Sequence, residues 1–238
     1  MILMYYYRGT ENKMNSEIIV GFLKDRNDLG LQFDSSTISS LCRNINRDLP
    51  ILIVNVHGAR ETIDVGLSIT GEEGLSPYEP YKRAGFSLFR PSGTTESDRI
   101  KKSIQQAFDK GYASVVLLSH SVPNLPLSYI EEALSRLRED GGMVLGPLKN
   151  GGFYLIGVTR SAFKSGCFGE ILPGLCFCDG SGKEEILVRV GSKGIRLFLL
   201  PEWYLVRTPE DLKRLCEEQG NGPEWNARWT RHTSYDLL

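Results

Sequence analysis

Apolar runs that suit buried strands alternate along this chain with segments whose apolar residues recur at helical spacing. The strand-like runs lie at 18–23, 51–56, 114–118, 143–145, 153–158 and 195–200. The helix-like segments lie at 36–45, 95–110, 127–139 and 208–219. Strands that are apolar throughout are typical of a sheet that helices cover on both faces. The pattern therefore predicts an α/β fold, a three-layer α/β/α sandwich with a mainly parallel sheet.

Two of the predicted helices begin with recognisable capping residues. Thr95 is followed three residues later by Asp98, which predicts a capping box, and Lys110-Gly111 predicts the end of that helix. Thr208-Pro209-Glu210-Asp211 combines an N-cap, a proline at the first helical position and a capping acid. These signals fix where both helices start.

The pattern is lost between residues 57 and 90, where glycines, prolines and charges interrupt it. We expect irregular connections in this region, with short strands at 67–69 and 86–89.

The length of 238 residues and the hydrophobic content of 41% suit one substantial core, so we expect a single domain. We place this domain at residues 17–219, between an N-terminal tail at 1–16 and a C-terminal tail at 220–238. The apolar start of the first tail is only seven residues long, too short to span a bilayer.

The composition excludes some classes of partner. With 28 basic and 29 acidic residues the formal net charge is −1, so we expect no binding to nucleic acid or to a membrane surface. The five cysteines are odd in number and lack framework spacing, which indicates reduced thiols and a cytoplasmic location. Cys176-Phe177-Cys178 lacks the second half of a zinc site, because the three histidines are scattered. The sequence leaves open whether the chain forms a homo-oligomer.

Two blocks combine an apolar strand with residues that suit a ligand site. The strand at 114–118 ends in polar residues and a Pro-Asn-Leu-Pro segment, and Gly151-Gly152 interrupts the apolar run before Phe153 and Tyr154. In parallel sheets ligands bind beyond the carboxyl ends of the strands. The glycines and aromatic residues suit a sugar or base pocket, and they equally suit a glycine hairpin that enters a core strand.

These blocks resemble a family of uncharacterised nucleotide-diphospho-sugar transferase-like proteins, the DUF2064-like family with a glycosyltransferase A-type (GT-A) fold, related to the guanylyltransferases that activate phospholactate. In that family the blocks read roughly Gly-Ser-Asp-x-Pro-Asp-Leu-Pro and Gly-Pro-x-x-Asp-Gly-Gly-Tyr-Tyr-Leu-Ile-Gly. In this chain Ser121, Asn124 and Asn150 take the places of the aspartates. The resemblance extends from about residue 93 to 212, half of the chain.

Three further matches support the resemblance. The segment 93–99 is similar to Gly-x-Asp-Leu-Gly-Glu-Arg and retains Gly93 and Arg99. The segment 203–212 is similar to Trp-x-Asp-Val-Asp-Thr-x-Glu-Asp-Leu, with Leu205 and Arg207 in place of two acids. Lys24 matches a lysine that precedes the family's phosphate loop, although the rest of that loop differs, so Lys24 is either a ligand or a surface charge.

The resemblance implies a nucleotide or nucleotide-sugar ligand and a magnesium or manganese ion held by carboxylates. Because neutral or basic residues replace the acids, we expect no metal and no cofactor. The candidate catalytic positions, which are those of the family acids, are Ser121, Asn150 and Arg207. The candidate nucleotide- or sugar-binding residues are Lys24, Gly93, Arg99, Asn124, Gly151, Gly152, Phe153 and Tyr154.

Two functions from different classes follow. In the first, the protein is a glycosyl- or nucleotidyltransferase in which Arg207 stabilises diphosphate charge in place of a metal. In the second, the site has decayed and the protein is a non-catalytic relative that acts as a binding, regulatory or oligomeric partner. Hydrolase chemistry is disfavoured, since His120 and Ser121 are adjacent without a Gly-x-Ser-x-Gly turn. We expect Ser121, Asn150, Gly151-Gly152 and Arg207 to converge on one cleft.

Overall fold

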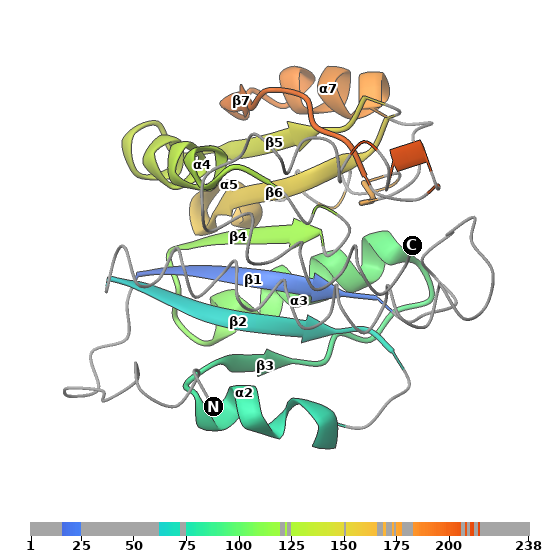
Figure 1. Cartoon of the computed structure of the whole chain (residues 1–238). Helices are drawn as coiled ribbons and strands as arrows, with labels where there is room; N and C mark the ends of the chain where they lie inside the picture. The colour runs from blue at the N-terminus through green and yellow to red at the C-terminus, as the bar shows by residue number, and fades with distance from the viewer. Residues whose placement is uncertain are drawn as a thin grey trace.

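The computed structural model describes residues 16–24, 62–71, 75–119, 122, 125–149, 151–165, 169, 173, 175–177, 183–205, 208, 210–211 and 214. These residues form a seven-stranded sheet with the order β3-β2-β1-β4-β6-β5-β7 (Figure 1). The strands are β1 (Glu17–Leu23), β2 (Ile63–Ile69), β3 (Ser87–Phe89), β4 (Ser114–Ser119), β5 (Met143–Pro147), β6 (Phe153–Thr159) and β7 (Leu197–Leu199). Each pair is parallel except those of β6, which runs antiparallel to β4 and β5.

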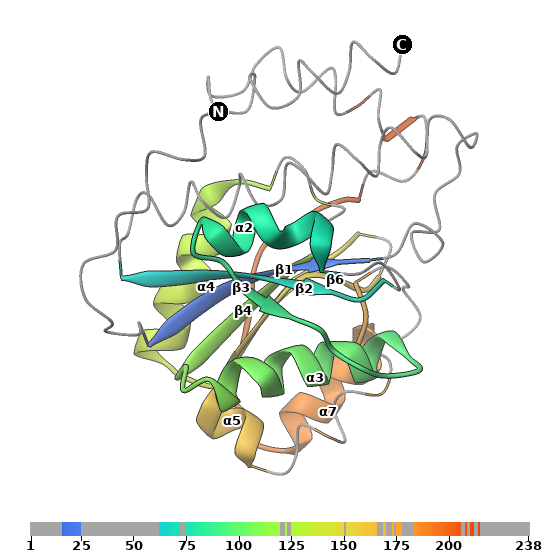
Figure 2. The same cartoon turned by 90° about the horizontal axis from the view of Figure 1, so that it is seen from below.

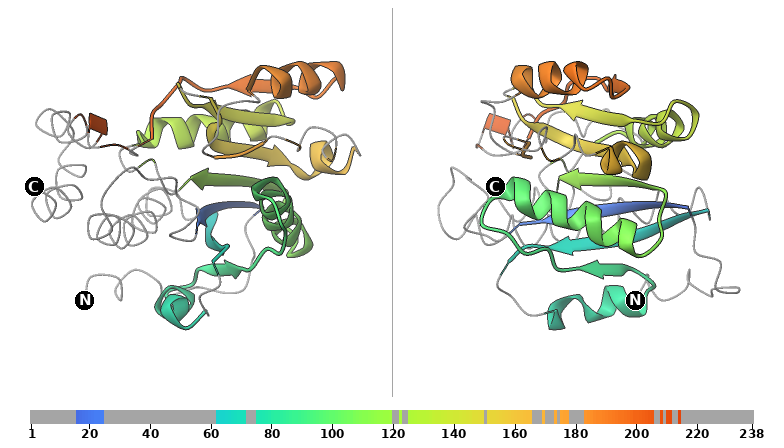
Figure 3. Two further views of the ribbon diagram at one scale, coloured as in Figure 1. Left: turned by 90° about the vertical axis from the view of Figure 1, so that its right-hand side faces the viewer. Right: turned by 180° about the vertical axis from the view of Figure 1, so that it is seen from behind.

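Helices cover both faces of this sheet (Figure 2). One face carries α3 (Glu96–Asp109), α5 (Arg160–Lys164) and α7 (Lys183–Ser192), and the other carries α2 (Glu79–Arg83) and α4 (Leu127–Glu139). In the view from behind in Figure 3, α3 lies over the middle of the sheet and α7 over its β5–β7 end. The predicted three-layer α/β/α sandwich with a mainly parallel sheet is confirmed.

The strands β1, β4, β5 and β6 each contribute to two hydrophobic cores, one on each face of the sheet. In β4, Val115 and Leu117 belong to the core under α3 and α7, whereas Val116 and Leu118 belong to the core under α4. All four side chains are fully buried. Because successive side chains of a strand point to opposite faces, covering both faces requires an apolar residue at every position. This requirement explains the uninterrupted apolar runs in the sequence.

The glycine block is a hairpin between β5 and β6. Leu148 N–H donates to the carbonyl of Gly152, and Gly151 N–H donates to the carbonyl of Leu148, each at 3.1 Å. The φ angles of Gly151 and Gly152 are +83° and +72°, a region that side chains with a Cβ rarely adopt. The backbone at Gly151-Gly152 therefore forms the glycine hairpin that the sequence suggested as one alternative. Because this turn reverses the chain, β6 runs antiparallel to β5.

Several predicted elements agree with the structure and others do not. The helix at 127–139 has the predicted bounds, and the Thr95 capping box is present. The region 57–90 is more regular than predicted, since β2 spans seven residues and α2 forms near its end. The helices α5 and α7 were not predicted.

Other predictions fall on residues that the structure does not describe. The predicted helix at 36–45 and strand at 51–56 lie outside the described residues, as do the tails apart from Ser16. The domain limits therefore stay a prediction. None of the described helices combines the length and the apolar character that crossing a bilayer would need.

Candidate functional site

The carboxyl ends of the parallel strands lie along one edge of the sheet. The arrowheads of β1, β2, β4 and β5 point to the same side in Figure 1. Lys24 follows β1, Thr70 follows β2 and Leu148 follows β5. The hairpin residue Gly152 lies at the same edge, because it precedes the antiparallel strand β6. The first turn of α3 also lies at this edge, because it follows the carboxyl end of β3. Open α/β sheets bind their ligands at this edge.

Lys24 forms a buried ion pair at this edge. Its Nζ lies 2.6 Å from Oε2 of Glu96, in the first turn of α3. The Lys24 side chain is 2% exposed and that of Glu96 is 18% exposed. The other carboxylate oxygen, Oε1, accepts a hydrogen bond from the backbone N–H of Phe177 at 2.8 Å. A buried ammonium requires such a counter-charge, because desolvating an isolated charge is costly. Glu96 was not among the predicted site residues.

Gly93 and Arg99 shape the turn that leads into α3. A Cβ on Gly93 would lie 2.5 Å from Cβ of Asp98, so a larger residue would displace the capping box. In that box Thr95 Oγ1 accepts from Asp98 N–H and Asp98 Oδ2 accepts from Thr95 N–H, both at 3.1 Å. The hydrogen bonds from Thr95 lower the pKa of Asp98 below its usual value. Arg99 Nη1 donates to the Gly93 carbonyl at 3.4 Å, which closes the turn.

Phe153 and Tyr154 are fully buried in opposite cores. The Tyr154 hydroxyl donates to the carbonyl of Pro201 at 2.9 Å. Burial, followed by the nearby charges of Tyr129 and Glu132, raises the pKa of Tyr154 well above its usual value. Neither ring exposes a face on which a base or sugar could stack. Both residues are therefore core residues that pack beneath the candidate site and do not face a ligand.

Trp203 brings a half-buried aromatic ring to the same edge. Its N–H donates to the carbonyl of Pro147, and its carbonyl accepts from Lys149 N–H, both at 3.0 Å. The ring lies edge-on to Tyr129 with centroids 5.6 Å apart and stacks on Tyr204 at 5.5 Å. Sequence reasoning did not select Trp203 as a site residue. Its position at the start of the segment 203–212, just after a strand, was the available signal.

A second lysine–glutamate pair lies at the β7 end of this edge. Nζ of Lys183 is 2.5 Å from Oε1 of Glu202. The hydrogen bond and the charge of Lys183, with a smaller contribution from Lys149, lower the pKa of Glu202. Glu202 is half exposed, so this pair is a surface contact, unlike the buried pair of Lys24.

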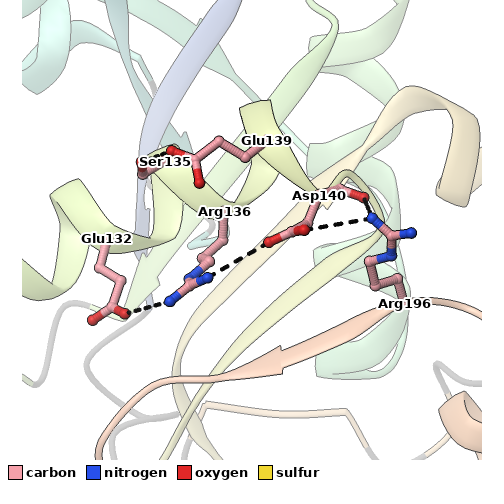
Figure 4. Close-up of polar contacts among 6 residues, drawn as sticks. All are labelled: Glu132, Ser135, Arg136, Glu139, Asp140 and Arg196. Atoms are coloured by element: carbon pink, nitrogen blue, oxygen red, sulfur yellow. Dashed lines mark hydrogen bonds and ion pairs between the residues drawn. The ribbon is translucent and has the colours of Figure 1, made fainter.

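A separate charge network lies at the opposite edge of the sheet, where the parallel strands β5 and β7 begin (Figure 4). Arg136 of α4 lies between Glu132, at 3.5 Å, and Asp140, at 3.7 Å, and Asp140 also faces Arg196 at 3.4 Å. These side chains are more than a third exposed, and such pairs contribute little to stability. The network joins the end of α4 to the start of β7 and lies away from the candidate site.

Four predicted site residues lie outside the described residues: Ser121, Asn124, Asn150 and Arg207. The predicted convergence on one cleft is tested only for Gly151 and Gly152, which do lie at the carboxyl edge. The capping residues after Arg207 are present, since Thr208 Oγ1 accepts from Asp211 N–H at 3.2 Å and Asp211 Oδ2 accepts from Thr208 N–H at 3.0 Å.

The described acids at this edge do not fit a magnesium or manganese site. Glu96 and Glu202 are each bound to a lysine, and Asp98 and Asp211 accept hydrogen bonds in capping boxes. Within the described parts of the chain, no three His, Cys, Asp or Glu side chains group together as metal ligands. Hard divalent cations take several charged oxygens that are not engaged by a cation. We therefore derive no chemical step through a metal.

Comparisons with solved structures give the same fold. A "putative nucleotide-diphospho-sugar transferase" from Desulfovibrio desulfuricans G20 has a TM-score of 0.74 at 21% identity, covering 94% of this chain and 99% of that chain. A 4-diphosphocytidyl-2C-methyl-D-erythritol synthase from Anaerococcus prevotii DSM 20548 has a TM-score of 0.56 at 9% identity, covering 84% and 95%. At these identities the likeness establishes the fold alone. No curated protein sequence matches the chain.

A protein-family model matches residues 53–173, slightly more than half of the chain. The family is described as "Uncharacterized protein conserved in bacteria (DUF2064)". The matched range contains β2 to β6 and α2 to α5, and so most of the described carboxyl edge. This protein therefore belongs to the DUF2064 family and has a nucleotide-diphospho-sugar transferase-like fold.

Proposed function

We propose that this protein binds a nucleotide or nucleotide sugar at the carboxyl edge of its sheet, as a transferase-family protein with a degenerate metal site. The observation that carries the proposal is Lys24, a cation that the fold holds almost fully buried just beyond the carboxyl end of β1, an inner strand of the sheet. A fixed ammonium at this place suits the diphosphate of a nucleotide. The likeness to nucleotide-diphospho-sugar transferase-like folds supports the same class of ligand.

The chemistry that we propose is glycosyl or nucleotidyl transfer without a metal. An acceptor oxygen forms the new bond, and the bond to the leaving diphosphate or pyrophosphate breaks. Where the acceptor is a hydroxyl, its proton passes to solvent, and the negative charge collects on the leaving group. We assign Lys24, which the structure describes at this edge, to stabilise the negative charge of the leaving group. We propose Arg207, from the sequence, as a second cation with the same role. Fixed cations stabilise charge that develops in a transition state, as a metal would.

A second candidate function is favoured by the ion pairs at this edge. Glu96 and Glu202 are each paired with a lysine, and the described residues contain no group of three His, Cys, Asp or Glu side chains that could hold a cation. A protein of this kind keeps the fold and a ligand but lacks catalysis, and acts as a binding, regulatory or oligomeric partner. We also propose a cytoplasmic location, because the five cysteines are odd in number and lack framework spacing, which indicates reduced thiols.

Calorimetric titration of the full chain tests these proposals. The ligands are CTP, UDP, GDP and UDP-glucose, each with manganese and with a chelator. We expect saturable binding that survives chelation and that Lys24→Met weakens at least tenfold. Arg138→Met, which removes a cation at the opposite edge, is the control and leaves binding unchanged.

Product formation separates the two candidates. Transfer to water or to an added acceptor by the chelated protein supports the transferase, whereas binding without turnover supports the non-catalytic relative. If no ligand of the panel binds under either condition, the nucleotide proposal is wrong.

A further inference from the structure

The Glu96 carboxylate is an anion that lies directly beside the buried Lys24 ammonium, with Oε2 2.6 Å from Nζ. We propose that the Glu96 carboxylate occupies an anion subsite, so that a ligand phosphate reaches Lys24 by displacing it. The inference rests on the proposed function in one respect, because it takes the carboxyl edge as the ligand face. It adds that Glu96 sets the affinity of this edge for anions.

The burial of the two partners gives the direction of access. Lys24 is 2% exposed, and Glu96, at 18%, is the partner that reaches solvent. An anion that approaches from solvent therefore meets the carboxylate before it meets the ammonium. The two anions compete, since the Glu96 carboxylate already balances the charge of the buried ammonium and would repel a second anion beside it.

The place of Glu96 in its helix means that a phosphate would gain the same kind of electrostatic stabilisation that the carboxylate has there. Glu96 is the first residue of the 14-residue helix α3, where the helix dipole stabilises a negative charge. A phosphate that replaced the carboxylate would meet the same dipole and the same ammonium. The exchange therefore trades one satisfied anion for another and leaves no cation unpaired.

Displacement of Glu96 would also loosen the segment 175–177. The hydrogen bonds that hold this segment include those from Phe177 N–H to Glu96 Oε1 at 2.8 Å, from Ser97 Oγ to the Leu175 carbonyl at 2.9 Å, and from Phe153 N–H to the Cys176 carbonyl at 3.1 Å. The ring of Phe177 packs on Phe22 of β1 at 5.2 Å. Only the first of these contacts depends on Glu96, so anion binding is coupled to the Phe177 amide in particular.

Titration with inorganic pyrophosphate tests the inference on the full chain. The variant Glu96→Gln keeps an oxygen that can accept from the Phe177 amide but removes the competing charge. We expect it to bind pyrophosphate at least tenfold more tightly than the wild type, and we expect Lys24→Met in the same background to abolish the gain.

Glu17→Gln is the matched control. Glu17 is the first residue of β1, its side chain is 7% exposed, and it pairs with Arg138 at 2.5 Å, so it is a buried ion-paired carboxylate at the opposite edge. It should leave pyrophosphate affinity unchanged. Equal affinity of Glu96→Gln and the wild type, or a gain that persists without Lys24, would overturn the inference.

A second measurement on the wild type covers the case in which Glu96→Gln does not fold. Saturating pyrophosphate should speed hydrogen exchange of the Phe177 amide and leave that of Phe153 unchanged, and exchange that is unaffected at Phe177 contradicts the coupling. The two proposals fail separately. Pyrophosphate binding to Glu96→Gln without nucleotide binding rejects only the nucleotide, and nucleotide binding with no effect of Glu96→Gln rejects only the anion subsite.

Discussion

Gly146 of β5 leaves room for the ring of Tyr154 in β6. A Cβ built on Gly146 would lie 2.4 Å from Cζ of that ring and 2.5 Å from Cε2. The ring cannot move away easily, because its hydroxyl donates to the Pro201 carbonyl and the residue is fully buried. This contact sets how β5, β6 and the chain after β7 pack at the candidate site.

Gly146→Ala should therefore destabilise the protein by about 1–3 kcal/mol, the usual cost of overpacking a rigid core. Gly191→Ala is the control, since a Cβ there meets nothing within 4 Å and the residue lies in helix α7. We expect that variant to be more stable by about 0.4–1 kcal/mol. Urea unfolding of both variants measures the two effects, and equal midpoints would contradict the packing argument.

Tyr154 should make stability fall at high pH. Its folded pKa is raised above the ordinary value of 10.0, chiefly by burial, so the unfolded chain loses the phenolic proton first as pH rises. The free energy of unfolding should then decline above about pH 10, by about 1.4 kcal/mol per pH unit for this one group. Tyr154→Phe lacks this contribution. Its pH profile between 9 and 11 should be flatter than that of the wild type, and parallel profiles would refute the assignment.

Removing one partner of the buried ion pair should have unequal effects. Glu96→Met leaves the Lys24 ammonium buried and should cost about 3–5 kcal/mol. Lys24→Met should cost less, because Glu96 still accepts from Phe177 N–H and lies at a helix N-terminus. The double variant should recover part of the loss. A double-mutant cycle from chemical unfolding measures the coupling, and additive losses would mean that the pair is not coupled.

The capping box of α3 should respond to acid. Thr95→Ala removes the hydroxyl that accepts from Asp98 N–H and should cost about 1 kcal/mol near neutral pH. The folded pKa of Asp98 is lowered, so its stabilisation is present above the ordinary value of 3.8 and is lost as pH falls through the folded value. The difference between wild type and variant should therefore shrink in acid. Thermal unfolding at pH 7 and pH 3 checks this, and a constant difference would contradict it.

Manganese should not bind at millimolar concentration, because Ser121, Asn150, Leu205 and Arg207 replace the acids that the resemblance would supply. Changing Ser121, Asn150 and Arg207 together to aspartate should create manganese binding that calorimetry detects. Heat from manganese in the wild type would refute the first expectation. Unchanged heat in the triple variant would mean that the backbone no longer brings these positions together.

The fold was predictable where one local signal sufficed. The helix at 127–139 and the start of α3 at Thr95 agree with the structure, because apolar spacing and capping residues act within a few positions of each other. The strand β2 was predicted too short, because its polar residues are satisfied by partners far away in the sequence. Its Asp64 accepts from the Tyr112 hydroxyl at 2.9 Å and its Ser68 hydroxyl lies 2.6 Å from that of Ser103. These partners lie far along the chain, so the polar residues read as breaks in the strand.

Sequence by itself determined the layers of this protein and the edge where a ligand site belongs. Apolar periodicity reports which faces are buried, and the order of strands and helices then places the strand ends on one side. Only the tertiary structure decided which charges at that edge are already neutralised and which aromatic rings are exposed. Lys24 and Glu96 are 72 residues apart, and Phe153 and Tyr154 are core residues rather than a stacking surface. Pairing and burial of this kind depend on contacts between distant segments, and these contacts exist only once the chain has folded.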